Sequence, residues 1–174
     1  IDPQAQPGGL HLGAVVAGSV GWLLVRQISD GLVQSRLSAS RAEAVSQTAS
    51  ARELLGSAGS SDFDPATQLR QVAEALVARG KLRGYAVVVM GPIGPRAGGS
   101  PATGIRTTPG VSATSVPARL QRVVAARTSG TSWTYTRLRR LADPPGTGTP
   151  SVVVGSRIVL PSDGGTYALY YVFP

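Results

Sequence analysis

The chain has 174 residues, 42% of them apolar, which is enough for one domain with a hydrophobic core plus appendages. It has no Cys, which excludes disulfides, thiolate metal sites and cysteine nucleophiles, and its single His (His11) makes a catalytic triad or a histidine metal site a poor hypothesis. The net charge of +8 comes from residues 81–174, with 11 basic and 2 acidic residues, whereas residues 1–80 have 6 and 7. No charge run is long, so we expect a dispersed, solvated basic surface and no nucleic-acid partner.

An uncharged apolar stretch stands near the start of the chain. Residues 1–6 have the character of a tag remnant, and residues 12–25 hold fourteen uncharged residues closed by Arg26. Fourteen residues are fewer than the roughly 20 that cross a bilayer. We interpret the stretch as part of a first transmembrane helix, with Trp22 in the interfacial aromatic belt. The alternative is a buried helix.

Two helices are expected next. Residues 28–55 contain no Pro and have a thin apolar stripe with small residues in its middle, which predicts a long helix packed closely against a helix or a sheet. Gly56 is expected to end it. Asp64 and Pro65 are a helix start signal, and apolar residues recur with helical spacing as far as Val77. Gly80 is expected to close this second helix.

The second half of the chain predicts mainly strands. Residues 85–90 are a continuous apolar run typical of a central buried strand, and residues 91–115 are expected to form a long loop with a short strand near 104–108. A short helix is expected over residues 116–126. The stretch 132–141 alternates as a strand does, with Arg139 on the same face as Trp133, and strands at 151–160 and 166–173 complete a meander.

These elements predict an α+β domain. Three strands joined by short turns must be antiparallel neighbours, and the strand at 85–90 is expected to pair at the other side of the same sheet. We therefore expect one antiparallel sheet with helices on one face, a PAS-like build. A β-sandwich is the weaker alternative, because nearly half of the chain is expected to be helical.

Four stretches of sequence carry a family resemblance. In chain order they read GWLLVRQISDGLVQSRL, YAVVVMGP, PSVVVGSRIVLP and YALYYVFP. Together they resemble the region between the two transmembrane helices of MtrB-type sensor histidine kinases of actinobacteria, over about residues 15–174. The resemblance implies a PAS-like, Cache-related sensor domain on the extracytoplasmic side of the cell membrane. Residues 1–26 would be the tag remnant and partial transmembrane helix, and residues 27–174 the sensor domain, with a long helix at 27–56 and a sensor core at 62–174.

The same resemblance implies the role of the chain. It would be the signal-sensing part of a two-component kinase that controls a response regulator of cell envelope and division. The kinase parts, with their ATP and Mg²⁺, would lie in other domains, so this fragment is expected to have no cofactor and no enzymatic activity. His11 precedes the sensor region and cannot be the phosphoacceptor. The implied partners are a second copy joined through the long helix, the response regulator and an extracytoplasmic lipoprotein, with flanking helices in the membrane.

The candidate ligand site is the sheet face together with the long loop expected to cover it. Aromatic rings and guanidinium groups there would suit an anionic ligand or an acidic partner segment. The residues are Tyr85, Arg106, Trp133, Tyr135 and Arg137. The competing interpretations are core packing for the aromatic residues and a solvated surface for the Arg residues. Two other functions stay open: a secreted or membrane-anchored module that binds a protein or an anionic envelope polymer, and a DNA binder driven by the basic second half.

Overall fold

The computed structural model describes residues 8–57, 64–93 and 104–174. The chain divides into two compact units, Ile1–Ala39 and Ser40–Pro174. Helix α1 (Gly8–Ser57) supplies the described part of the first unit and continues into the second. Within the described residues, no helix combines the length and the apolar character needed to cross a membrane. The transmembrane origin of residues 12–25 therefore stays a prediction.

Helix α2 (Pro65–Arg83) begins where the sequence predicts. Asp64 is its N-cap, and a carboxylate oxygen of Asp64 accepts a hydrogen bond from the backbone N–H of Thr67 at 3.2 Å. The sequence predicts that this helix ends at Gly80, but the helix continues to Arg83. Gly84, in the left-handed region at φ 77°, is its C-cap.

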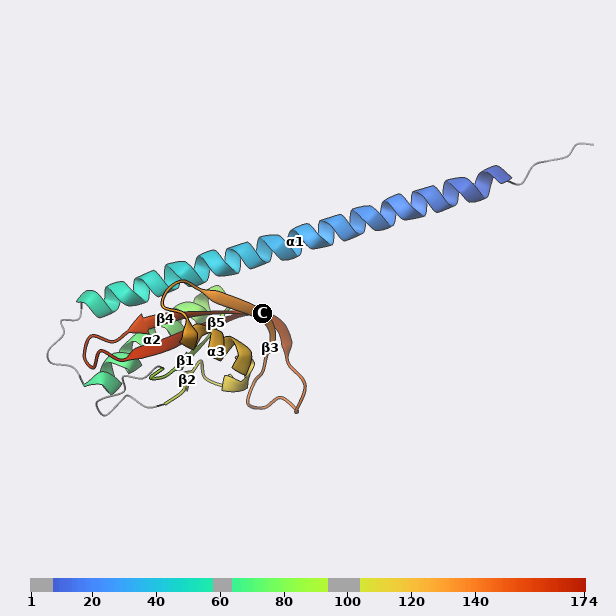
Figure 1. The fold of residues 1–174 in the computed structure, drawn as a ribbon. Helices are drawn as coiled ribbons and strands as arrows, with labels where there is room; N and C mark the ends of the chain where they lie inside the picture. The colour runs from blue at the N-terminus through green and yellow to red at the C-terminus, as the bar shows by residue number, and fades with distance from the viewer. Residues whose placement is uncertain (1–7, 58–63, 94–103) are drawn as a thin grey trace, which may run out of the picture. The chain divides into compact units, whose positions relative to one another are not determined.

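The remaining elements form one antiparallel sheet of five strands (Figure 1). The strands are β1 (Ala86–Met90), β2 (Arg106–Thr107), β3 (Ser132–Leu138), β4 (Thr149–Val159) and β5 (Thr166–Phe173), with the 3₁₀ turn η1 (Ala113–Ser115) and helix α3 (Ala118–Ala126) between β2 and β3. Their order in the sheet is β2-β1-β5-β4-β3. The α+β class, the antiparallel meander and the pairing of β1 at its far side are thereby confirmed.

Helices cover both faces of the sheet, so the expectation of helices on one face is wrong. Buried residues of α1 and α2 pack with the sheet residues that include Val87 and Tyr171, whereas α3 packs through Leu120 and Val124 on the other face. The reason is that β1 and β5 are buried on both sides: Val87 and Val88 point to opposite faces and both are fully buried. A sheet whose central strands are apolar on both faces needs a cover for each.

The part of α1 in the second unit meets the sheet through small side chains. Ala44 and Ala51 are fully buried and Leu55 nearly so, at helical spacing along one stripe. Small residues let the helix axis approach the sheet closely, as the sequence predicts. Within the second unit, the predicted stripe itself is wrong apart from Leu55, because Ala42, Val45, Ala49 and Leu54 are exposed and Ala44 and Ala51 face the sheet instead.

The two ends of the sheet are distinguished by the chain segments that meet there. At one end, called here the Phe173 end, β5 finishes, β1 begins and the β3–β4 hairpin projects. The opposite end, called the Thr166 end, holds the β4–β5 turn. Glu43 binds Arg83 just before β1, and Arg52 binds the carbonyl of Arg157 near the Thr166 end. The part of α1 that belongs to the second unit therefore starts at the Phe173 end.

Candidate functional site

The five residues predicted to form a site share one sheet face but do not form one site. Cross-strand pairing and core contacts place them on the face that α1 and α2 cover. They are Tyr85, Arg106, Trp133, Tyr135 and Arg137. Arg106 belongs to β2 at one edge of the sheet, and the last three belong to β3 at the other edge, with three strands between them.

The long loop does not cover this face in its described part. Val111 from that loop is buried against the opposite face, beside α3, and Ile93 and Ala113 pack against the same cluster. Residues 94–103 lie outside the described residues. The sequence predicts a site between this sheet face and the loop. In the described residues, α1 and α2 cover the face instead.

Tyr85 is a core residue. Its side chain is 4% exposed, and its ring centre lies 5.3 Å from that of Phe173 and 5.8 Å from that of Tyr171. The phenolic oxygen is buried without a hydrogen-bond partner. Burial raises the pKa of the Tyr85 hydroxyl, and the charge of Glu43 raises it further. Core packing, one of the two interpretations kept open for the aromatic residues, accounts for Tyr85.

Trp133 and Tyr135 form an aromatic pair at the edge of the sheet. Their ring centres lie 5.6 Å apart at an interplanar angle of 89°, an edge-to-face contact. Trp133 packs partly against the core, but Tyr135 is 57% exposed, so core packing does not explain Tyr135. Arg137, exposed on the same strand, donates to the carbonyl of Gly148 at 3.1 Å. This edge offers an aromatic surface with a guanidinium beside it.

Arg106 lies in a separate groove of about 440 Å³ between α2 and β2. The groove also holds the ion pair of Arg70 with Glu74 at 4.0 Å, and Ile105, which is 59% exposed. Its lining residues are Arg70, Ala73, Glu74, Val77, Ala78, Val89, Ile105, Arg106, Thr107 and Pro109. With charges of both signs and an open shape, the groove has no clear preference for one sign of ligand.

A second groove, of about 340 Å³, lies at the Thr166 end and is lined by two guanidinium groups. Arg52 donates to the carbonyl of Arg157 at 2.9 Å, and Arg157 donates to the carbonyl of Arg127. No carboxylate lines the groove, whose residues are Arg52, Leu55, Gly56, Thr128, Ser129, Gly130, Arg157, Val159, Pro161 and Thr166. Guanidinium groups held by carbonyl oxygens keep donors for an anion. Sequence reasoning missed this pair because the two residues are 105 positions apart.

A hydroxyl network fixes α1 on the sheet. The Thr48 hydroxyl lies 2.7 Å from the Ser156 hydroxyl and 3.2 Å from that of Tyr171, and it donates to the carbonyl of Ala44 at 2.8 Å. All of these groups are buried, and burial raises the pKa of the Tyr171 hydroxyl. A buried hydrogen-bond network admits fewer alternative positions than an apolar contact does. It therefore sets the register of α1.

A second polar contact joins α1 to α2. One guanidinium nitrogen of Arg83 lies 2.6 and 2.8 Å from the two carboxylate oxygens of Glu43, and Gln47 donates to Glu43 at 2.9 Å. The Gln47 carbonyl oxygen is buried without a partner. The contact surface between α1 and the rest of the second unit, called here the seam, is thus polar at several positions. These polar contacts favour one position of α1 over others.

Within the residues described, no group of three or more His, Cys, Asp or Glu side chains is placed to hold a metal ion. Comparisons with protein-family models, curated proteins and solved structures found no match. The second unit is thus defined by its own geometry: an α+β domain with an anion-suited groove and a helix held on its sheet by polar contacts.

Proposed function

We propose that this chain is the extracytoplasmic signal-sensing domain of a membrane-bound sensor histidine kinase, which controls a response regulator of cell envelope and division. The observation that carries the proposal is the meeting of two chain segments at the Phe173 end, where α1 enters the second unit and β5 finishes (Figure 1). A sensor domain set between two membrane helices needs both of its connections on the side that faces the membrane.

The sheet supports the proposal. The strand order β2-β1-β5-β4-β3, with a helix inserted between β2 and β3, is the arrangement expected of a PAS-like domain. The two helices that precede β1 cover the second face, as a Cache-related sensor would require. A likeness of fold alone does not assign a function, so the kinase role rests on the sequence resemblance as well.

The mechanism follows from the seam between α1 and the sheet. The Thr48 network and the ion pair of Glu43 with Arg83 make α1 a helix held in one register on the domain. A ligand or partner that binds a second register of α1 more tightly would shift the population toward that register, to an extent set by its differential affinity for the two states. In a dimer joined through α1, this shift would reach the cytoplasmic kinase, which would use ATP and Mg²⁺. An extracytoplasmic lipoprotein is the proposed partner.

The test uses the full-length product of the gene in membrane vesicles. We expect phosphorylation of a His with labelled ATP, followed by transfer to a response regulator. Thr48→Val is expected to change the basal phosphorylation level by loosening the seam, whereas Thr48→Ser, which keeps the hydroxyl, is expected to leave it near that of the natural protein. A gene product without ATP-dependent histidine phosphorylation would refute the proposal.

The groove with Arg52 and Arg157 favours a second candidate function. A membrane-anchored or secreted module that binds an anionic envelope polymer would use two guanidinium groups free of carboxylate partners in the described residues. Binding of such a polymer that is weakened at least tenfold by Arg52→Gln with Arg157→Gln, in a gene product lacking kinase activity, would favour this function.

A further inference from the structure

The two most exposed of the large hydrophobic side chains in the described residues are both at the Phe173 end. Leu82 is 87% exposed and Leu141 is 74% exposed. Leu82 lies in the last turn of α2, two residues before the Gly84 cap, and α2 is followed by Tyr85, whose ring contacts Phe173. Leu141 follows β3 in the β3–β4 hairpin, which projects at this end.

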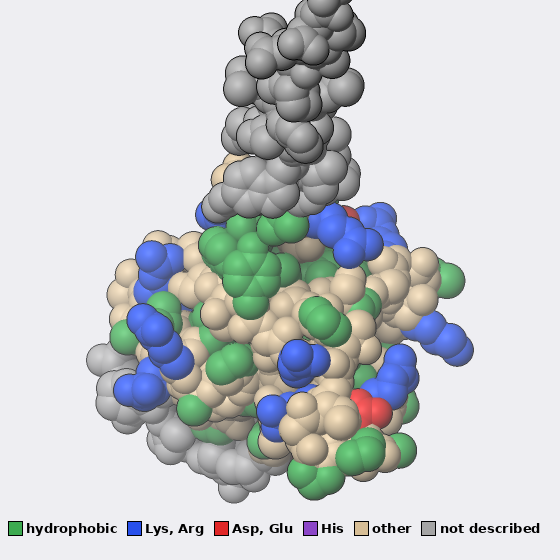
Figure 2. Space-filling model, turned by 90° about the vertical axis from the view of Figure 1, so that its right-hand side faces the viewer, with side chains coloured by type: hydrophobic (Ala, Val, Ile, Leu, Met, Phe, Trp, Pro, Cys, Tyr) green, Lys and Arg blue, Asp and Glu red, His purple; other side chains and the backbone are tan. Residues whose placement is uncertain are grey.

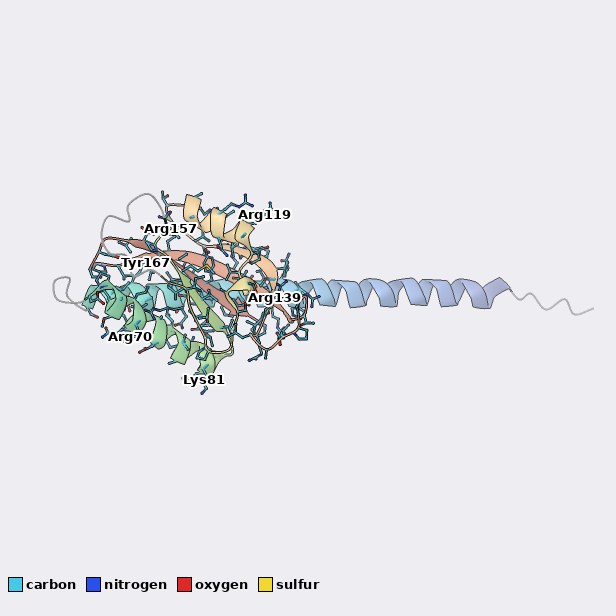
Figure 3. The ribbon with its side chains drawn as sticks, turned by 90° about the horizontal axis from the view of Figure 1, so that it is seen from below. Arg70, Lys81, Arg119, Arg139, Arg157 and Tyr167 are labelled. Atoms are coloured by element: carbon cyan, nitrogen blue, oxygen red, sulfur yellow. The ribbon has the colours of Figure 1, made fainter. Side chains whose placement is uncertain are left out.

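Basic residues adjoin both leucines. Lys81 and Arg83 flank Leu82, and Arg139 and Arg140 directly precede Leu141. Figure 2 looks onto this end and shows Lys and Arg side chains spread among apolar ones with little acidic surface. In Figure 3, Arg139 lies at the end of the unit opposite Arg70 and Arg157.

The carboxylates near these residues do not balance the charge. Glu43 pairs with Arg83, and Asp143 accepts from the backbone N–H of Arg140, so two carboxylates stand against the four cations Lys81, Arg83, Arg139 and Arg140, and a charge of about +2 remains. An exposed leucine is ordinary by itself. Here two exposed leucines lie at one end of a domain, and each has two basic residues beside it, which is the pattern of an interfacial membrane contact.

We propose that the Phe173 end rests on an anionic lipid bilayer, with Leu82 and Leu141 inserted among the headgroups and with Lys81, Arg139 and Arg140 on lipid phosphates. Each basic residue near an anionic surface contributes attraction, and the leucines add apolar burial. The first residues of α1 in the second unit and the last residue of β5 lie at this same end. The inference relies on the proposed function only for the nearby bilayer.

The test uses single fluorescent probes in the 174-residue chain. Because the sequence has no Cys, Leu141→Cys and Leu82→Cys each allow one environment-sensitive fluorophore to be attached at one site. We expect a blue shift with phosphatidylcholine vesicles that contain about a third phosphatidylglycerol, and none with phosphatidylcholine alone. Val159→Cys, a probe on an exposed residue at the Thr166 end, is the control and is expected to show no shift.

Charge variants separate this contact from binding by residues 12–25, which all variants share. Arg139→Gln with Arg140→Gln is expected to raise the lipid concentration for half of the shift about tenfold or more. Arg122→Gln with Arg127→Gln, the same charge change on and just after α3, is expected to leave it unchanged. Absence of a shift at position 141 with anionic vesicles, or a shift insensitive to Arg139 and Arg140, would overturn the inference. Neither result bears on histidine phosphorylation, so the two proposals fail separately.

Discussion

Gly80 and Tyr85 are in contact at the junction of α2 and β1. The Gly80 carbonyl accepts the backbone N–H of Tyr85 at 3.0 Å, and a Cβ at position 80 would lie 2.6 Å from the Tyr85 carbonyl oxygen and 2.9 Å from its ring. The missing side chain at Gly80 lets the buried Tyr85 ring pass over the helix. Position 80 is thus required for close packing rather than for ending the helix.

Gly80→Ala is expected to destabilise the protein by about 1–3 kcal/mol, because the added Cβ meets backbone that cannot move away easily. The matched control is Gly56→Ala in α1, where a Cβ would meet nothing within 4 Å. That change is expected to be neutral or stabilising by about 0.5 kcal/mol through helix propensity. Urea unfolding of the two variants measures both. Equal effects would contradict the packing role of Gly80.

Thr48→Val is expected to lower the free energy of unfolding by about 1–3 kcal/mol. The substitution keeps the shape of the side chain but leaves the buried hydroxyls of Ser156 and Tyr171 without their shared partner. Thr48→Ser keeps the hydroxyl and is expected to lose less than Thr48→Val. Urea unfolding monitored by circular dichroism compares the two, and a Val variant as stable as the Ser variant would show that the network does not stabilise the seam.

Asp64→Ala is expected to cost about 1 kcal/mol, because the backbone N–H of Thr67 loses its side-chain acceptor at the start of α2. Asp64→Ser restores an N-cap acceptor and is expected to recover most of the loss. Thermal unfolding of the two variants provides the measurement. A Ser variant no better than the Ala variant would indicate that the charge at this position, rather than the cap, stabilises the helix.

The protein is expected to lose stability as the pH rises above about 10. Burial raises the pKa of Tyr170 to about 12 and also raises the pKa values of Tyr85 and Tyr171, whereas tyrosines in the unfolded chain titrate near 10. The unfolded state therefore releases protons first, and each such tyrosine removes about 1.4 kcal/mol per pH unit between its two pKa values. At pH values below the pKa of tyrosine in the unfolded chain, the tyrosines are protonated in both states and this loss of stability is absent. Urea unfolding from about pH 9 to 11 tests this, and Tyr170→Phe should make the decline shallower.

The helices and strands could be predicted from local sequence signals, whereas the faces that the helices cover and the position of the grooves depend on long-range packing. The N-cap at Asp64, the β1 run and the alternation of β3 follow from neighbouring residues, and each lies within a few positions of its predicted place. The face that α3 covers depends on how the chain crosses the sheet after β2, which no local pattern specifies. The groove with Arg52 and Arg157 forms only when α1 lies on β4. The prediction that Arg106 shares a site with the β3 residues is wrong, because residues on one face of a sheet can lie on strands at opposite edges.

The Ser115 hydroxyl has a consequence for how this protein behaves at high concentration. It accepts the backbone N–H of Arg139 at 2.9 Å, while Ser112 donates to the carbonyl of Arg139 at 2.8 Å, just beyond the end of β3. The edge that β3 exposes is thereby closed at that end, and the edge at the other side of the sheet is β2, only two residues long. Short or covered edges give little template for strands of other molecules. Pairing with strands of other molecules is therefore blocked just beyond β3 by a hydroxyl group in the place of a backbone partner, and it is limited at the opposite edge by the length of β2.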